Sequence, residues 1–516
     1  MMRGVRRLSA GRGGRGTLGR LLPILLLLAM PVRALADGSM AAAPTAAAPA
    51  PAAPPAASPA TPAADGAALA AALGFAGGDF GFMLTDLDAG RVLAQQSADA
   101  LFLPASVTKL VTAFAAIRIL GPGHQFETIL YRRGADLYLR GGGDPMLATP
   151  DLQPLLAALA AAPPPKGGRF FYDESLVGSY PQIAPEQPMA AAYNPGFGGL
   201  NLNFNRIEVR WKRTAKGTGF AVRSPAEGLD VTVDWIPIVP GPDSQPKSQP
   251  FIFAGKNGAE RWLYSPHLEP AGTLSLPVKN PGRQAALVFR KLAAMSGIAL
   301  APPQPAPTPL DAVPVARVAS PALAEIVAKV LKHSNNMSAE LIGLTTSRAL
   351  SGGAPAPTPA RSAALICGWL ERQLPAVDWR GFALANHSGL ATTSRVSPRQ
   401  LTALLGLVAA DPDFAALLPE IKSDEDLVLA STGAEPRPVV AKSGTMDYAR
   451  GLAGLMTGRD GHRLAFAIMI FDAEQRRLFD ASLDPRVLNP PPTARAWLKR
   501  ARALDESLLL QWGQNY

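Results

Sequence analysis

Two segments of the chain alternate apolar and polar residues about a short polar turn. The first, residues 80–96, turns at Asp88–Gly90, and the second, residues 450–472, turns at 459–461. This alternation predicts two β-hairpins. Apolar residues at three- and four-residue spacing predict helices over residues 106–119, 321–332, 339–349 and 398–409. We therefore expect an α+β fold, in which an antiparallel sheet is flanked by helices.

The middle of the chain, residues 126–312, has a different pattern. Strand-like pieces such as residues 202–212 are separated by turns rich in Gly and Pro, such as GGGDP at 141–145. This pattern predicts a large, mainly β inserted region of one or more domains. The flanking segments, residues 67–125 and 313–516, would then form the two parts of one domain.

Residues 1–36 have the layout of a secretory signal peptide. Six arginines precede the short apolar run Leu21–Met30, and Ala34–Ala36 follows it. The run is shorter than the roughly 20 residues that span a bilayer, so we expect cleavage after Ala36, export to the periplasm and no stable membrane insertion afterwards. Residues 37–66 are mostly Ala and Pro and predict a linker.

Charge and side-chain chemistry argue against several classes of function. The formal charge of +10 falls to +3 when residues 1–36 are removed, because they contain seven Arg and no acidic residue, and nucleic acid is therefore not an expected partner. The single Cys367 cannot form an intramolecular disulfide. The five histidines lack metal-ligand spacing, so we expect neither a metal nor a cofactor.

The segment PASVTKL places Ser106 and Lys109 three residues apart at the start of a predicted helix. This spacing puts the hydroxyl and the amine on one face, where a neutral lysine can take the serine proton. Burial and nearby cations would favour the neutral amine by lowering its pKa. A second Ser-x-x-Lys, from Ser244 to Lys247, contains Pro246 and is expected in a loop.

Two further polar motifs follow along the chain. Ser334–Asn336 lies between two predicted helices, where its side chains could point into a cleft together or serve only as a loop or helix cap. Lys442–Thr445 lies directly before the C-terminal hairpin, on an expected edge strand, where Gly444 would let a substrate backbone lie close. Each motif is common by chance, but the order and context of all three indicate a catalytic site.

The motifs Ser-x-x-Lys, Ser-x-Asn and Lys-[Thr/Ser]-Gly resemble those of the active-site serine penicillin-binding proteins. The resemblance implies a penicillin-binding/β-lactamase-like transpeptidase domain. It implies Ser106 as the nucleophile, Lys109 as its base, and the N–H groups of Ser106 and Thr445 as the oxyanion hole. It also implies that Ser334 and Lys442 relay the proton to the leaving amine. The implied substrate-binding residues are Asn336, Ser443, Gly444 and Thr445.

Ser106 and Ser334 are 228 residues apart, a far longer connection than in β-lactamases. The chain therefore resembles the class C low-molecular-weight group, the D-Ala-D-Ala carboxypeptidase/endopeptidase family. By this resemblance Asn336 would hold the substrate amide, while Ser443 and Thr445 would bind the terminal carboxylate. The implied partners are peptidoglycan stem peptides as substrates and β-lactams as inhibitors. The stretches that resemble the family's insert are residues 120–131, 136–147, 171–176 and 199–209.

Three places depart from the family pattern. The family's Asp-x-Ser-Gly-Leu is Asn386–Leu390 here, so an acidic group is missing near the cleft. Residues 418–440 lack the usual Gly-Thr-Leu and Arg signature. The family often holds the free amine of the stem peptide with an acidic residue after a tryptophan, but residues 179–189 have no tryptophan and offer only Glu186.

The predicted function is that of a serine D-Ala-D-Ala carboxypeptidase/endopeptidase that cleaves a terminal D-Ala, or a D-Ala-linked cross-bridge, through an acyl-enzyme on Ser106. Two alternatives remain. A β-lactamase would need fast deacylation, and the long insert argues against it. A catalytically silent scaffold that binds peptidoglycan would keep the fold, and the three intact motifs argue against that.

Overall fold

The computed structural model describes residues 64–516 apart from residues 227, 230, 257, 258, 356, 357, 422–437 and 483–490. The predicted signal peptide and all but the last three residues of the predicted linker lie outside these residues, as does most of the segment that precedes Lys442. Among the residues described, no helix has both the length and the apolar character needed to cross a membrane.

Strands from the two ends of the described chain form one antiparallel sheet, in the order β17-β18-β19-β1-β2. Its members are β1 (Phe80–Asp86), β2 (Arg91–Gln96), β17 (Val440–Met446), β18 (Ala449–Thr457) and β19 (Arg463–Phe471). The β1–β2 and β18–β19 hairpins confirm the two hairpins predicted from the sequence. Pairing of β1 with β19, for example Thr85 with Ala465, brings the ends of the chain into one sheet.

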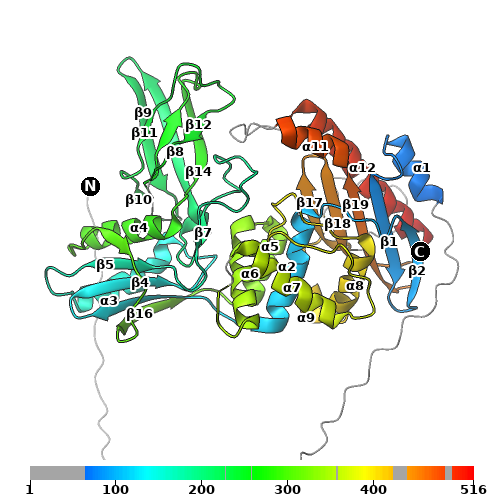
Figure 1. Cartoon of the computed structure of the whole chain (residues 1–516), viewed down its shortest axis with the longest axis horizontal. Helices are drawn as coiled ribbons and strands as arrows, with labels where there is room; N and C mark the ends of the chain where they lie inside the picture. Colours follow the sequence, from blue (N-terminus) through cyan, green and yellow to red (C-terminus); the bar gives the residue numbers. More distant parts are fainter. Residues whose placement is uncertain are drawn as a thin grey trace, which may run out of the picture. The chain divides into compact units, whose positions relative to one another are not determined.

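Successive side chains of β19 face two different cores, as the two-residue period of a strand requires. Phe466 and Ile468 pack in one core with α12 (Pro492–Asn515), whereas Ala465 and Ala467 belong to the other core. Figure 1 shows α12 over one face of the sheet, together with α11 (Ala473–Ser482) and α1 (Ala64–Ala72). Small side chains on the opposite face let helices approach the sheet closely.

A layer of helices covers that opposite face and carries the first two of the three motifs. It consists of η1 (Ala105–Val107), α2 (Thr108–Leu120), α5 (Leu323–His333), α6 (Asn336–Leu350), α7 (Pro359–Gln373), α8 (Pro398–Ala409) and α9 (Pro412–Ala415). The four predicted helices are confirmed, and α7 is an addition to them. Every residue of α2 from Thr108 to Ile117 is buried, so this helix forms the centre of the layer.

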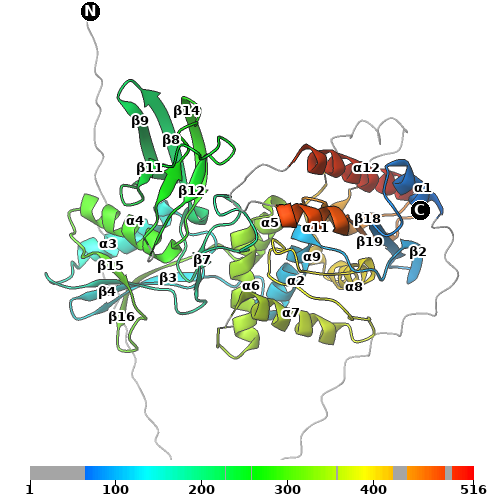
Figure 2. The ribbon, with the colours of Figure 1, turned by 45° about the horizontal axis from the view of Figure 1, so that its top comes forward.

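The middle of the chain is built around two further hydrophobic cores. The first lies beneath a five-stranded sheet of order β15-β5-β4-β3-β16, with α3 (Gln153–Ala161) and α4 (Pro281–Met295) packed on it (Figure 2). Its strands are β3 (Glu127–Arg133), β4 (Asp136–Gly141), β5 (Phe170–Asp173), β15 (Pro303–Pro305) and β16 (Val313–Ala319). The short η2 (Thr149–Leu152) leads into α3.

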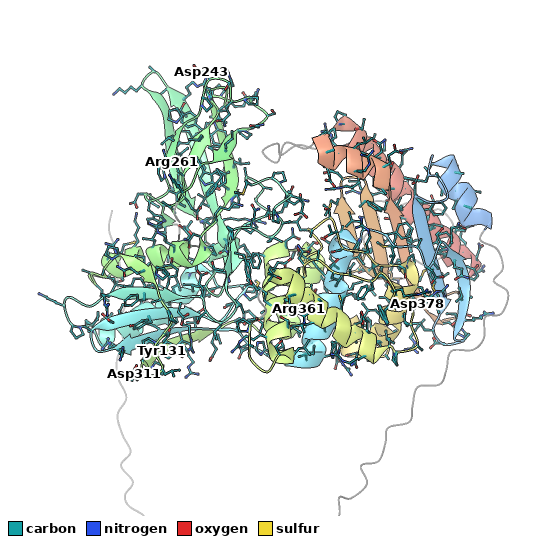
Figure 3. All side chains as sticks on the ribbon, viewed as in Figure 1. Tyr131, Asp243, Arg261, Asp311, Arg361 and Asp378 are labelled. Atoms are coloured by element: carbon teal, nitrogen blue, oxygen red, sulfur yellow. The ribbon has the colours of Figure 1, made fainter. Side chains whose placement is uncertain are left out.

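The second core lies between smaller sheets of orders β10-β9-β8-β14 and β11-β13-β12. Their strands are β8 (Arg206–Thr214), β9 (Gly217–Ser224), β10 (Val231–Thr232), β11 (Ile238–Pro240), β12 (Phe251–Phe253), β13 (Trp262–Tyr264) and β14 (Ala271–Pro277). The remaining elements are β6 (Ser179–Tyr180), β7 (Phe197–Gly198) and η3 (Asn203–Asn205). In Figure 3, Asp243 and Arg261 mark this part, while Tyr131 and Asp311 mark the part around the first core.

The chain enters this middle region through β3 and leaves it through β16. The two strands pair antiparallel, with Glu127 opposite Ala319. Because β3 follows α2 and β16 precedes α5, the paired strands hold both connections to the helical layer side by side. The exit strand runs to Ala319, seven residues past the boundary at 312 set from the sequence.

Candidate active site

Ser106 and Lys109 lie at the junction of η1 and α2. The Lys109 ammonium group donates a hydrogen bond of 2.9 Å to Ser106 Oγ, as their three-residue spacing predicts. Ser106 is half-buried, whereas Lys109 is fully buried. Ala105, directly before the serine, has a left-handed backbone with φ 45°, a conformation that costs a non-glycine residue about 1 kcal/mol or more. The surrounding structure therefore holds the serine in a strained turn.

Lys109 makes two further hydrogen bonds that define its surroundings. Its Nζ donates to Asn336 Oδ1 over 2.8 Å and to the carbonyl oxygen of Ser388 over 2.7 Å. Burial, reinforced by the like charge of Lys442, holds the pKa of Lys109 well below its ordinary value, and the carboxyl of Glu340 opposes that shift. A lysine in this environment can release its proton and act as a base.

Ser334 and Asn336 lie at the turn between α5 and α6. Asn335 is the N-cap of α6, because its Oδ1 accepts from the backbone N–H of Ser338, so the cap function predicted as the alternative belongs to the middle residue. Asn336 contacts Lys109, and its Nδ2 donates to the carbonyl of Tyr193 over 3.0 Å. Ser334 has a left-handed backbone at φ 57°. Within the described residues, its hydroxyl bonds to none of the other predicted site residues.

The Lys442–Thr445 motif lies on β17, which is the edge strand of the main sheet, as predicted. A Cβ at Gly444 would lie 2.5 Å from the carbonyl oxygen of Pro104 and 2.9 Å from the backbone nitrogen of Ser106. The glycine thus lets the protein's own strand and the turn that carries Ser106 lie in contact. Lys442 is buried, and burial together with the charge of Arg450 lowers the pKa of its ammonium group to about 8.

Arg450 is a member of this site that the sequence motifs did not reveal. It lies opposite Thr445 in the β17–β18 pairing, and its Nη1 donates to Thr445 Oγ1 over 2.9 Å. Its Nε donates over 2.6 Å to Asp505 of α12, whose pKa burial raises to about 6. The guanidinium is therefore fixed beside Thr445. Arg450 could have been found from the sequence by pairing the predicted strand β18 with the strand that carries the Lys-Ser-Gly motif, because this places Arg450 opposite Thr445.

The turn Asn386–Leu390 closes the site behind Lys109. The Asn386 side chain accepts from Gly389 N, and Gly389 has φ 74°. A Cβ at Gly389 would also collide with the carbonyl oxygen of Ala105, so only glycine fits there. The family's acidic residue is replaced by Asn386 in this turn, and a different carboxylate, Glu340 from α6, binds the backbone of the same turn.

A loop of the middle region also reaches the site. The Tyr193 carbonyl binds Asn336, and Gln187 Nε2 donates to the carbonyl of Leu390 over 3.3 Å. Glu186, the acidic residue that the sequence offered for a substrate amine, accepts instead from the backbone N–H of Thr392 over 3.0 Å. The side-chain contact that the structure gives Glu186 therefore fastens the loop to the helical domain.

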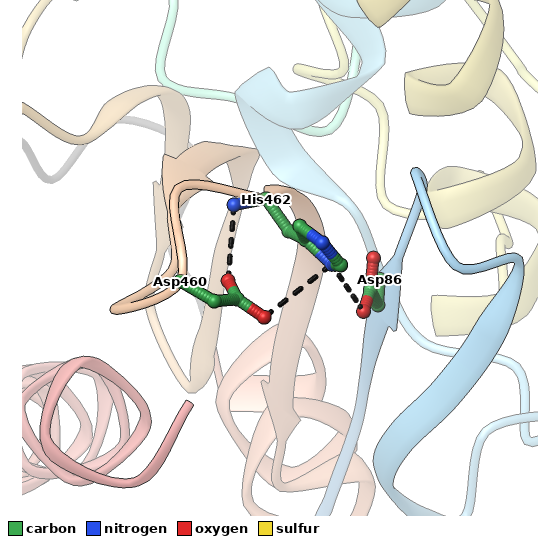
Figure 4. Close-up of side chains that lie close together, drawn as sticks. All are labelled: Asp86, Asp460 and His462. Atoms are coloured by element: carbon green, nitrogen blue, oxygen red, sulfur yellow. Dashed lines mark hydrogen bonds and ion pairs between the residues drawn. The ribbon is translucent and has the colours of Figure 1, made fainter.

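One cluster with metal-ligand chemistry lies outside this site. Asp86, Asp460 and His462 meet where β1 passes the β18–β19 turn, as Figure 4 shows. His462 Nδ1 lies 3.0 Å from Asp86 Oδ2, and Arg91 Nε lies 3.6 Å from that same oxygen. The carboxylates raise the pKa of His462, so the group is an ion-pair cluster that ties the turn to β1.

Two other sequence features have structural roles. Cys367 is buried in the helical layer, and burial raises the pKa of its thiol to about 12, which suits a small apolar core residue. The second Ser-x-x-Lys, from Ser244 to Lys247, lies in turns as expected, and Lys247 pairs with Glu269.

Comparison with solved structures shows the fold of this chain. The crystal structure of penicillin binding protein 4 (dacB) from Haemophilus influenzae matches with a TM-score of 0.66 and 20% identity, over 86% of this chain and 99% of that chain. A second crystal structure of that protein, in complex with a β-lactam, matches with a TM-score of 0.61. This chain therefore has the α+β fold of the penicillin-binding proteins, as predicted.

The family follows from sequence comparison. The model of the D-Ala-D-Ala carboxypeptidase 3 (S13) family matches residues 67–484, and the chain belongs to this family. A D-alanyl-D-alanine carboxypeptidase of Actinomadura sp. (strain R39) is 27% identical over 89% of this chain and 88% of its own length. D-alanyl-D-alanine carboxypeptidase DacB of Haemophilus influenzae is 25% identical over 76% of this chain and 85% of its own length. The predicted resemblance is thus confirmed.

Proposed function

We propose that this chain is a serine-type D-Ala-D-Ala carboxypeptidase and D,D-endopeptidase that acts on peptidoglycan through an acyl-enzyme on Ser106. The observation that carries the proposal is the 2.9 Å contact between Nζ of the buried Lys109 and the half-exposed Ser106 hydroxyl. A lysine whose pKa is held low by burial is a suitable base for a serine nucleophile. The substrates are stem peptides and cross-bridges that contain a D-Ala-D-Ala linkage.

In the acylation step, Ser106 Oγ attacks the carbonyl carbon of the penultimate D-Ala, and the hydroxyl proton passes to Lys109. The backbone N–H groups of Ser106 and Thr445 are the proposed donors to the tetrahedral oxyanion. The close approach of Gly444 to the Ser106 turn supports this pairing. The C–N bond then breaks, and Ser334 and Lys442 pass a proton to the leaving amine. Water hydrolyses the ester, which releases the shortened peptide and restores Ser106.

Recognition of the substrate uses the groups around this turn. Asn336 Nδ2 is the proposed donor to the substrate amide, and it keeps a second hydrogen for this purpose beside its bond to Tyr193. Ser443 and Thr445 are the proposed hydroxyl donors to the terminal carboxylate. The charges of Lys442 and Arg450 favour an anion at that place, since Arg450 donates directly to Thr445.

The cellular place of the enzyme follows from its substrate and from the N-terminal sequence. The family acts on the bacterial cell wall. We propose that residues 1–36 direct export and are removed after Ala36, so that the mature enzyme acts in the periplasm.

Intact-mass analysis with benzylpenicillin tests the proposed nucleophile. The purified mature protein should gain the mass of one penicilloyl group, because the β-lactam carbonyl would acylate Ser106 and the ester would persist. The variant Ser106→Ala should gain none while it keeps the same thermal unfolding midpoint within about 2 °C. No adduct on the wild-type protein and no hydrolysis of the drug would instead indicate a silent peptidoglycan-binding scaffold.

Turnover assays then separate the related activities. Release of D-Ala from a pentapeptide muropeptide reports carboxypeptidase activity, and conversion of a cross-linked dimer to monomers reports endopeptidase activity. Rapid hydrolysis of many equivalents of a chromogenic cephalosporin, with neither muropeptide reaction, would identify a β-lactamase.

A further inference from the structure

A buried carboxylate lies next to the catalytic groups and has no part in the mechanism above. Glu340, on α6, has no exposed surface. Its Oε1 accepts from the backbone N–H of Ser388 over 2.8 Å, and its Oε2 accepts from the backbone N–H of His387 over 3.2 Å. Burial raises the pKa of Glu340, whereas its hydrogen bonds with Ser388 and His387 and the charge of Lys109 favour the ionised form. A charge buried so completely needs such partners.

The turn that Glu340 binds is the same turn that binds Lys109. Ser388 donates its N–H to Glu340, and its carbonyl oxygen accepts from Lys109 Nζ over 2.7 Å. The hydroxyl of Thr112, one helical turn along from Lys109, donates to the carbonyl of His387 over 3.0 Å. The short turn between Asn386 and Leu390 therefore connects the carboxylate on α6 with the lysine on α2.

The charged groups that face Lys109 come from two directions. Lys442 on β17 opposes a positive charge on Lys109, and Glu340 on α6 favours one. Arg450 lies behind Lys442 and acts on it. His387 is uncharged at neutral pH, because burial lowers its pKa to about 3, and its Nε2 bonds to the Ser362 hydroxyl. Glu340 is thus the negative charge that opposes the effect of Lys442 on Lys109.

We propose that Glu340 is a positioning residue for the reaction: it holds the Ser388 carbonyl against Lys109 and keeps on Lys109 the proton taken from Ser106. This inference rests on the proposed roles of Ser106 and Lys109. During acylation Lys109 becomes a cation inside the protein, close to Lys442. The charge of Glu340 and the aligned Ser388 peptide group offset that cost, because both direct negative charge or dipole toward the ammonium.

The test compares acylation rates with benzylpenicillin as a function of pH, for the mature wild-type protein and for Glu340→Gln. If neutral Lys109 is the base, the acid limb of the rate profile reports its pKa. Loss of the neighbouring negative charge should shift that limb to lower pH by about one unit. The plateau rate should fall about 10- to 100-fold, because the protonated lysine and the carbonyl lose their support. A role in folding alone would lower the rate without moving the limb.

Two further variants keep the test decisive. Glu340→Asp retains the charge, so its limb should stay near that of the wild-type protein even if the shorter side chain lowers the rate. Glu325→Gln, an exposed carboxylate in the first turn of α5, should leave both limb and plateau unchanged. Thermal unfolding shows which variants are folded. If Glu340→Gln does not fold, Glu340→Asp decides the question. Because this variant keeps the charge, an acid limb at the wild-type pH supports the proposal. An acid limb that shifts by about one pH unit, as expected for loss of the charge, overturns it.

The outcomes also separate this inference from the proposed function. Acylation of the wild-type protein on Ser106, with an unmoved limb in folded Glu340→Gln, overturns the role of Glu340 alone. A wild-type protein that is not acylated at any pH overturns the proposed function, and the role of Glu340 with it.

Discussion

Two buried lysines, one in the active site and one in the middle region, have nearly the same surroundings. Lys109 donates to the carbonyl of Ser388 over 2.7 Å, and Lys279 donates to the carbonyl of Asn194 over 2.8 Å. Each lies near a buried glutamate that accepts from two successive backbone N–H groups, which is Glu340 in one case and Glu260 in the other. Burial lowers both pKa values, that of Lys279 to about 7.

The difference between them is what else the ammonium group touches. Lys109 contacts the half-exposed hydroxyl of Ser106 and the amide of Asn336, and Lys442 supplies a second cation nearby. Among the described residues, the hydrogen bond given for Lys279 Nζ goes to a backbone carbonyl, and Glu260 is the charge that acts on it. A lysine with a lowered pKa is therefore not in itself the mark of a catalytic site, because burial lowers the pKa of Lys279 as well, against the opposing charge of Glu260. Lys109 differs from Lys279 because an accessible nucleophile, the Ser106 hydroxyl, lies within hydrogen-bond distance of it.

The largest expected effect separates the two lysines by rate. Lys109→Met should lower the rate of acylation by benzylpenicillin by about 10²- to 10⁴-fold, because the base is gone while the volume is nearly kept. Lys279→Met, the matched control, should acylate at close to the wild-type rate. Stopped-flow or intact-mass time courses measure both. A comparable loss of acylation rate in the two variants would show that Lys109 is not distinguished from Lys279 as a base.

The second effect separates them by stability. Lys279→Met should lower the free energy of unfolding by about 3 kcal/mol, because it leaves Glu260 buried without its cation. Lys247→Met removes an exposed lysine that is paired with Glu269 and should leave the free energy of unfolding nearly unchanged, because solvent screens the pair. Urea unfolding followed by circular dichroism gives both values. An unchanged urea midpoint for Lys279→Met would show that Lys279 and Glu260 together contribute no net stability.

The smallest effect concerns a third buried lysine, Lys442, through pH. Its pKa of about 8 means that it is charged below that pH and neutral above it. Binding of a substrate carboxylate should therefore weaken as the pH rises through about 8, with KM rising several-fold toward a plateau. Lys442→Met should show a high KM at all pH values. Steady-state release of D-Ala measures the profile, and a KM independent of pH in the wild-type protein would contradict the role of Lys442.

The sequence by itself determined the class of fold and the first members of the site. The hairpins at 80–96 and 450–472 followed from two-residue alternation, and the four helices followed from three- and four-residue spacing. The Ser106–Lys109 contact was also predictable, because three residues along a helix fix the distance between two side chains. The three motifs indicated the penicillin-binding proteins, and the 228-residue distance from Ser106 to Ser334 indicated the family, which sequence comparison confirms.

Tertiary structure alone decided how Lys109, the proposed base, is held. Glu340 and Arg450 belong to no short motif, and the sequence even indicated that an acidic group was missing at Asn386. These residues reach the site because α6 packs beside α2, and because β18 pairs with the strand that carries Thr445. Contacts between segments far apart in the chain depend on packing and register, which local spacing does not encode. The sequence therefore indicated the groups that we propose to react, and the fold determined the charges around them.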